Sequence, residues 1–138
     1  MVPRYQVLSH TADTGVVTYG ATVAEVFENT AFAMFDLMFG IGELAAEERI
    51  RIEVEAPTLE DLLVDWLSTL LFEAETRELA LCLFEIEDLE ESRLSAWVGG
   101  LASAARELTG PPVKAVTYHG LLIGETPGGY EARVIFDV

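Results

Sequence analysis

Residues 9–15 read Ser9-His10-Thr11-Ala12-Asp13-Thr14-Gly15, a polar stretch between two apolar runs that each have the character of a β-strand. The chain closes with Val134-Ile135-Phe136-Asp137-Val138, which is also strand-like. If strands from the two ends lie side by side, the carboxylates of Asp13 and Asp137 and the terminal carboxylate of Val138 meet at one edge of a sheet. The sequence therefore predicts an oxygen-rich pocket built from both ends of the chain.

The composition indicates one folded domain over residues 1–138. A chain of 138 residues with 51% hydrophobic residues is long enough to bury a core and too apolar to be disordered. Its 24 acidic and 8 basic residues give a formal net charge of −16. Because such a surface repels phosphate backbones, direct nucleic-acid binding is not expected, whereas cations or a basic protein surface are attracted.

The chain shows no segment that addresses it to a membrane. No apolar run is long enough to span a bilayer, and the residues after Pro3 and Arg4 lack the apolar core of a signal peptide. We therefore expect a cytoplasmic protein. The single cysteine, Cys82, lies in an apolar run and is expected to be a buried, unreactive thiol.

Two amphipathic helices stand out. Thr22 and Glu25 form a capping box before apolar residues at helical spacing, which predicts a helix from about Val23 to Met38. Thr58 and Asp61 occupy capping positions before a second helix with an inner stripe of leucines.

Strands are predicted between and around these helices. Strict alternation marks residues 49–55, and the segment 101–108 fits either a short helix or a loop. The other expected strands are residues 5–8, 16–19, 80–87, 94–98, 113–123 and 131–138. This order predicts an α+β fold in which both helices cover one face of a mixed β-sheet, with the N- and C-terminal strands adjacent.

The carboxylates are the first candidates for chemistry. Asp13 precedes a turn glycine and fits either an Asx turn or a ligand of a hard divalent cation such as calcium, magnesium or manganese. Asp137 lies between two apolar residues, so it either has a compensating partner or is solvated at a frayed end.

The basic candidates are fewer. His10 and His119, the two histidines, fit either structural roles or ligand and proton-transfer roles. No cysteine lies near them and they lack H-x-x-x-H spacing, which argues against a tetrahedral zinc site. Lys114, the single lysine, either serves solubility or meets a phosphate or a partner's carboxylate. The sequence contains neither a P-loop nor a dinucleotide-binding glycine motif.

Four segments, in order along the whole chain, resemble motifs of the archease family. They are similar to its H-T-A-D-x-G signature, its L-x-x-W-L helix, its V-K-A-x-T-Y-H strand and its terminal aspartate followed by isoleucine or valine. These segments are His10-Thr11-Ala12-Asp13-Thr14-Gly15, Leu62-Leu63-Val64-Asp65-Trp66-Leu67, Val113-Lys114-Ala115-Val116-Thr117-Tyr118-His119 and Phe136-Asp137-Val138. Thr14 and the stretch Gly120-Leu121-Leu122 depart from the family pattern but leave the acidic and basic candidates in place.

The resemblance implies a non-enzymatic partner of an RtcB-type RNA ligase in tRNA splicing and RNA repair. Such partners promote guanylylation of the ligase and allow multiple turnovers. By this resemblance Asp13 and Asp137 are metal ligands, completed by the Val138 carboxylate, and Lys114 is the ligase-activating basic group. His10 and His119 receive supporting roles.

Two other functions stay open at the level of sequence. A small metal-dependent phosphate-ester hydrolase would use Asp13, Asp137 and His119 to hold a metal and activate water. A purely structural chaperone or adaptor would leave the pocket incidental, so that metal would not affect partner binding.

Overall fold

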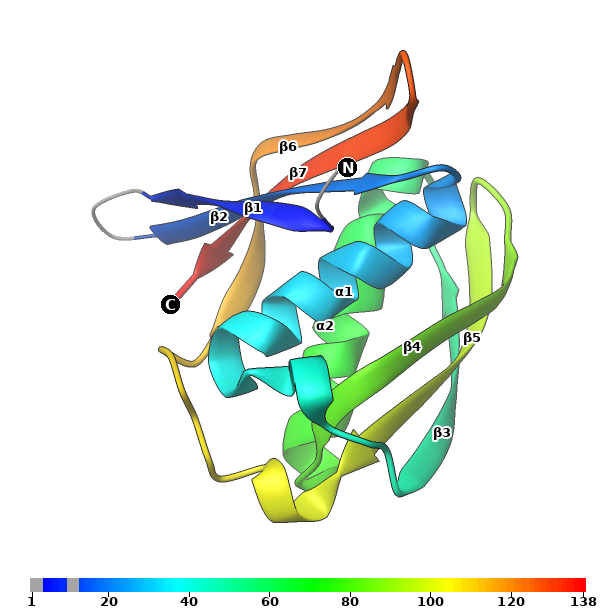
Figure 1. Cartoon of the computed structure of the whole chain (residues 1–138). Coiled ribbons are helices and arrows are strands. Elements are labelled where there is room, and N and C mark those ends of the chain that lie inside the picture. The colour runs from blue at the N-terminus through cyan, green and yellow to red at the C-terminus, as the bar shows by residue number, and fades with distance from the viewer. Residues whose placement is uncertain (1–3, 10–12) are drawn as a thin grey trace.

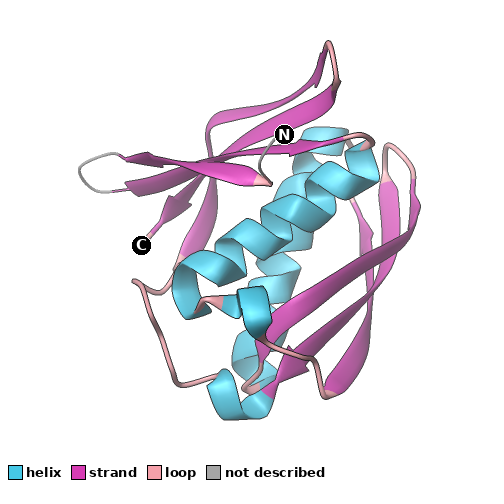
Figure 2. Cartoon of the chain, viewed as in Figure 1, coloured by secondary structure: helices cyan, strands magenta, loops and turns pink. Residues whose placement is uncertain are grey.

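The computed structural model describes residues 4–9 and 13–138, and in this range two helices lie between two β-sheets (Figure 1, Figure 2). The helices are α1 (Val23–Phe39) and α2 (Leu59–Arg77), with short 3-10 turns η1 (Ile41–Glu43) and η2 (Ala102–Ala104). The strands are β1 (Tyr5–Ser9), β2 (Asp13–Gly20), β3 (Glu48–Glu55), β4 (Ala80–Leu89), β5 (Arg93–Leu101), β6 (Ala115–Thr126) and β7 (Gly129–Asp137). One sheet has the order β1-β2-β7-β6 and the other β3-β5-β4, and all their pairings are antiparallel.

The α+β class, the packing of both helices on strands and the pairing of an N-terminal with the C-terminal strand are confirmed. One detail differs, because the strands form two antiparallel sheets instead of one mixed sheet. The reason lies in α1, which is apolar around most of its circumference and contacts β2 on one side and β4 on the other. A helix buried on two sides needs an apolar layer against each of them.

Both helices begin where the capping residues predict. Thr22 Oγ1 accepts a hydrogen bond from the Glu25 N–H at 3.1 Å, and Thr58 Oγ1 accepts one from the Asp61 N–H at 3.1 Å. These bonds satisfy amides that have no partner within the helix. Helix α1 ends at Gly40, whose φ of 65° is the left-handed conformation that glycine adopts without steric cost.

Polar contacts inside the core hold the layers in register. The fully buried Trp66 of α2 donates from Nε1 to the carbonyl oxygen of Phe27 in α1 at 3.0 Å. Between β2 and α1, the buried hydroxyls of Thr18 and Thr30 lie 2.7 Å apart, and Thr30 also donates to the Val26 carbonyl. These three buried polar side chains therefore each have a partner, as stability requires.

The outer face of the three-stranded sheet is charged, as the alternation of residues 49–55 predicts. Arg49 and Arg51 on β3 form ion pairs of 2.6 and 2.8 Å with Glu85 and Glu87 on β4. Both guanidinium groups also lie over the ring of Trp97 on β5. The distance from Cζ to the ring centre is 5.6 Å for Arg49 and 5.4 Å for Arg51. The network covers an apolar ring on a solvated face.

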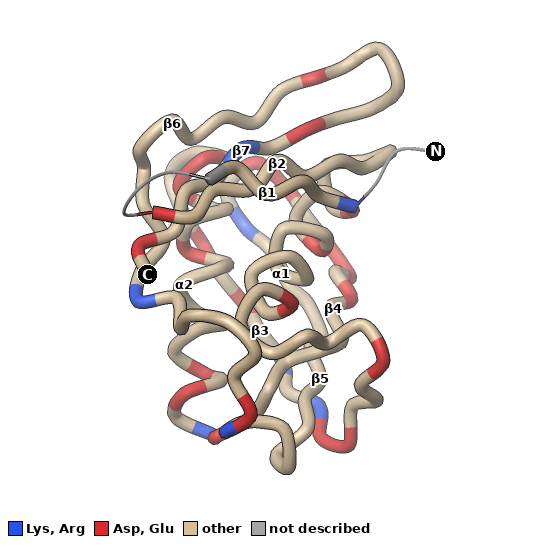
Figure 3. The backbone as a smooth tube through the Cα atoms, turned by 60° about the vertical axis from the view of Figure 1, so that its left-hand side comes forward, with Lys and Arg blue, Asp and Glu red and all other residues tan. Residues whose placement is uncertain are grey.

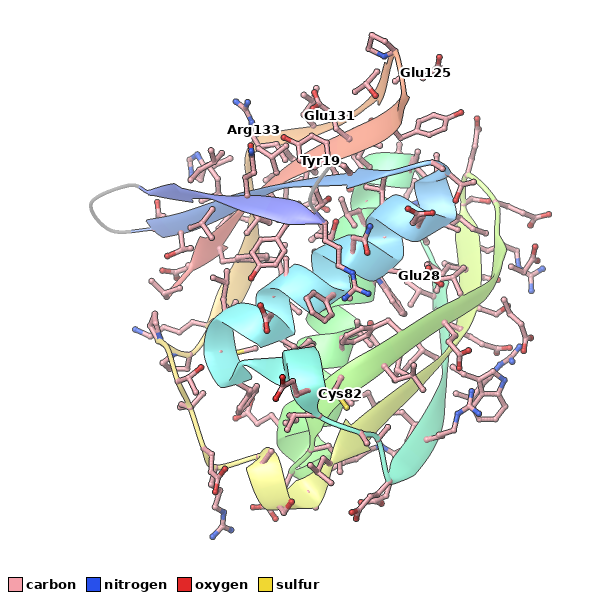
Figure 4. The ribbon with its side chains drawn as sticks, viewed as in Figure 1. Tyr19, Glu28, Cys82, Glu125, Glu131 and Arg133 are labelled. Carbon is pink, nitrogen blue, oxygen red and sulfur yellow. The ribbon has the colours of Figure 1, made fainter. Side chains whose placement is uncertain are left out.

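Two further predictions can be compared with the structure. Cys82 is half-buried, and burial raises the pKa of its thiol, which supports the prediction of an unreactive cysteine (Figure 4). The ambiguous segment 101–108 contains η2 followed by a loop. In the described ranges, neither helix combines the length and the apolar character that crossing a membrane requires.

Candidate functional site

The two aspartates predicted to meet are direct neighbours across two strands. Asp13 is the first residue of β2 and Asp137 the last of β7, and the antiparallel register pairs them with each other. Directly opposite residues have Cβ atoms about 4.5–5.5 Å apart. The structure thus brings together two carboxylates from opposite ends of the chain.

Both carboxylates belong to the outer face of the four-stranded sheet. Ala132, Val134 and Phe136 of β7 are fully buried against the helices, so the alternating residues face outward. Figure 4 shows Glu131 and Arg133, which share this face with Asp137, projecting away from α1. Asp13 pairs directly with Asp137 across the β2–β7 ladder, so its side chain lies on the same outer face. Like charges directly opposite one another are destabilising, and a cation between them removes this cost.

The chain terminus and Lys114 lie at the same sheet end. The backbone N–H of Lys114 donates to the Asp137 carbonyl oxygen at 2.7 Å, and the following residue, Ala115, pairs with Asp137 in the β6–β7 ladder. Val138 follows Asp137, the last residue of β7, and packs its side chain against the core. Figure 3 shows acidic and basic segments close together around the C-terminus.

The structure separates His119 from the two aspartates. Ala115 pairs with Asp137 and Thr117 with Ile135, and the ladder is then interrupted until Leu122 pairs with Arg133. His119 lies in this interruption, exposed and beyond the Thr117 rung. Gly120, with a φ of 61°, makes the irregular backbone possible. His10, the other predicted supporting residue, lies outside the described residues.

The residues at this sheet end fit a hard divalent ion. Calcium, magnesium and manganese prefer oxygen ligands, and Asp13 and Asp137 supply carboxylate oxygens from directly opposite positions. Within residues 4–9 and 13–138, no three side chains of His, Cys, Asp or Glu are grouped as a metal site. The metal-binding role therefore stays a prediction that depends on the terminal carboxylate and on water completing the ligand set.

Sequence reasoning missed a hydrogen-bonded group beside the β6 interruption. Tyr118 donates from Oη to Asp61 Oδ1 at 2.7 Å, and Thr58 donates to Asp61 Oδ2 at 2.9 Å. The bond to Asp61 raises the pKa of Tyr118 to about 12, and the same bond lowers the pKa of Asp61. The sequence does single out both segments, since Asp61 is a capping residue of the second helix and Tyr118 lies in the V-K-A-x-T-Y-H motif. Only the fold shows that the two side chains are in contact.

Comparisons with known proteins agree with this architecture. The Archease protein family matches residues 5–138 of the chain. The chain belongs to the archease family. Protein archease of Methanosarcina mazei is 37% identical over 140 residues, which cover 98% of this chain and 96% of that protein. Protein archease of Sulfolobus acidocaldarius is 31% identical over 137 residues, covering 98% of this chain and 99% of the relative.

Solved archease structures share the fold. The solution structure of Methanobacterium thermoautotrophicum protein 1598 superposes with a TM-score of 0.78 at 33% identity, covering 98% of this chain and 99% of that one. A crystal structure from Thermotoga maritima, described as an archease and possible chaperone, gives a TM-score of 0.60 at 19% identity, with 95% and 94% coverage. The second likeness supports the fold alone.

Proposed function

We propose that this archease is a non-catalytic activator of an RtcB-type RNA ligase in tRNA splicing and RNA repair. It acts in the cytoplasm by promoting guanylylation of the ligase and so permitting multiple turnovers. The proposal is supported most directly by the Asp13–Asp137 pair, which places two like charges on one exposed face next to the chain terminus and Lys114.

The chain's own groups have distinct parts in this proposal. Asp13 and Asp137, with the Val138 carboxylate, hold a divalent ion at the end of the sheet. The ion supplies positive charge for nucleotide phosphate oxygens. Lys114 offers an ammonium group to those phosphates or to a carboxylate of the ligase.

The net charge of −16 supports a protein partner over RNA. An acidic surface repels an RNA backbone but is complementary to a basic protein whose active site accepts phosphates. Complementary charge raises the rate of encounter and orients the two proteins.

The two alternatives find less support. A hydrolase needs Asp13, Asp137 and His119 around one metal, and the interrupted β6–β7 ladder puts His119 beyond the Thr117 rung. A purely structural adaptor gives no reason for two aspartates paired across β2 and β7.

The test is a guanylylation assay of the ligase with variants Asp13→Ala, Asp137→Ala and Lys114→Ala. We expect each variant to lose at least about tenfold in stimulation, equivalent to roughly 1.4 kcal/mol. Glu131→Ala is the matched control, because Glu131 lies on the same face of β7 but pairs with Tyr19 at the far end of the ladder.

Wild-type stimulation by all three variants would discard the mechanism. Phosphate-ester hydrolysis by the purified protein alone, lost in Asp137→Ala, would instead favour the hydrolase. Partner binding that is insensitive to divalent ions would favour the adaptor.

A further inference from the structure

A groove of about 760 Å³ lies between α2 and the connection that leads from η2 into β6. Its walls are largely apolar and include Phe35, Met38, Leu71, Phe72, Leu108 and Val113. Phe72 is 64% exposed and Leu108 is 48% exposed, so the groove opens to solvent. Large apolar side chains gathered at one exposed place are typical of interaction sites.

One wall is a continuous stripe of α2. Ser68, Leu71, Phe72 and Glu75 line the groove, and their spacing of three, four and seven residues places them on one face of the helix. The exposed ring of Phe72 lies between a polar residue one turn before it and a carboxylate one turn after it. An exposed aromatic ring beside a carboxylate can bind an apolar side chain of a partner next to a basic one.

The opposite wall is held firmly to the end of α1. Thr109 and Gly110 donate from their backbone N–H groups to the Met38 carbonyl oxygen at 2.7 and 3.2 Å. The Val113 N–H contacts the Met38 sulfur at 3.3 Å. A Cβ on Gly110 would overlap the carbonyl oxygen of Leu37, so the chain passes α1 as closely as glycine permits. The groove is therefore a preformed feature of the fold.

Some charged side chains at the groove are already paired with each other, and others can contact a partner protein. Arg106, from the connection, forms an ion pair of 3.0 Å with Glu78, at the C-terminal end of α2. Lys114 lines the groove where the connection enters β6, and its backbone is bonded to Asp137. Within residues 4–9 and 13–138, Glu75 makes no ion pair, so its carboxylate is available to a cation of a partner.

We propose that the groove receives an apolar segment of the partner ligase that carries a Lys or Arg facing Glu75. This inference rests on the proposed function and adds a second contact to the one made by the carboxylate pair. Lys114 belongs to both places, so one partner can occupy the groove and reach the Asp13–Asp137 pair. A second copy of this chain is the weaker candidate, because it too carries a charge of −16 and repels the first.

The test separates docking from activation. Phe72→Glu and Phe72→Ser should weaken the measured affinity for the ligase by about tenfold or more, as expected of a central apolar anchor. At saturating concentrations both variants should still stimulate guanylylation. Asp137→Ala, by contrast, should lose stimulation even at saturating concentrations. Leu122→Ser is the matched control, because Leu122 is 47% exposed but lies outside the groove.

The outcomes distinguish this inference from the proposed function. Wild-type affinity of both Phe72 variants, with stimulation still lost in Asp137→Ala, overturns the groove as a docking site and leaves the proposed function standing. A wild-type protein that does not bind the ligase at all overturns both. Sedimentation that shows a wild-type dimer converted to monomer by Phe72→Glu, with ligase affinity unchanged, assigns the groove to self-association and overturns the inference. The exposed position of Phe72 keeps both variants folded, which circular dichroism verifies.

Discussion

At the residue scale, Tyr118 connects the candidate site to helix α2. Its hydroxyl donates to Asp61, the residue whose backbone N–H is already bonded to the Thr58 cap. The phenol is 56% exposed, and desolvation raises its pKa less than the hydrogen bond to Asp61 does. The hydrogen bond to the Asp61 carboxylate, which is lost when the phenol ionises, is the main reason that its pKa rises to about 12.

This bond predicts a titration that depends on Asp61. In Asp61→Asn the carboxylate charge is gone, so the pKa of Tyr118 should fall from about 12 toward the ordinary value of 10.0. Because the folded pKa lies above the unfolded one, the bond stabilises the protein fully below pH 10 and this stabilisation disappears as pH rises toward 12. Alkaline titration of tyrosine absorbance measures the change.

Tyr5 is the internal control for that titration. Its pKa is also raised to about 12, but mainly by burial, and then by its bond to Asp36. It should therefore titrate identically in wild type and Asp61→Asn. A Tyr118 phenol that titrates unchanged in the variant would contradict the assigned cause.

At the scale of elements, α1 is fastened to β2 by a pair of buried hydroxyls. Thr30 donates to the Val26 carbonyl, so Thr18 is the donor in the bond between the two threonines. Both side chains are fully buried. Removing one partner leaves a polar group in the core without compensation, whereas removing both does not.

A double-mutant cycle tests this coupling. Thr30→Val should lower the free energy of unfolding by about 1–3 kcal/mol, because the Thr18 hydroxyl loses its acceptor. Thr18→Val should cost about 1 kcal/mol, and the double variant should cost less than the sum. Denaturant unfolding of wild type, the two single variants and the double variant measures the free energies of unfolding. If the effects of the single variants simply add in the double variant, the two hydroxyls are not coupled.

At this scale, local sequence patterns are enough to predict the helices but not the arrangement of the strands. The capping residues and apolar periodicity predict both helices nearly to their ends, because those signals act within one or two turns. Division of the strands between two sheets was not predicted, since it depends on which distant surfaces α1 touches. The interruption of β6 was also missed, because it depends on how β6 pairs with β7, although Gly120 makes the irregular backbone possible.

At the scale of the molecule, an ion held by Asp13 and Asp137 would join β2, the second strand of the chain, to β7, the last strand. A ligand that binds the folded state and not the unfolded chain raises stability by mass action. At a calcium or manganese concentration of about 100 times the dissociation constant, the gain is roughly 2.7 kcal/mol. We therefore expect divalent ions to raise the melting temperature measurably.

Asp13→Asn and Asp137→Asn should abolish that rise, and each should stabilise the metal-free protein slightly by removing a like charge from the pair. Glu131→Gln should leave the response to metal unchanged. Calorimetric unfolding with and without the ion provides the measurement. Equal metal responses in all variants would place any bound ion elsewhere.

The sequence alone determined the helices, the strand segments, the acidic surface and the family motifs, because each follows from neighbouring residues or from composition. It also supplied the residues of the candidate site and the hypothesis that the chain's two ends meet. The tertiary structure alone decided that Asp13 faces Asp137, that His119 lies apart from them, and that Phe72 borders a groove. These facts depend on register and packing between segments distant in sequence, and such contacts are set by the whole core.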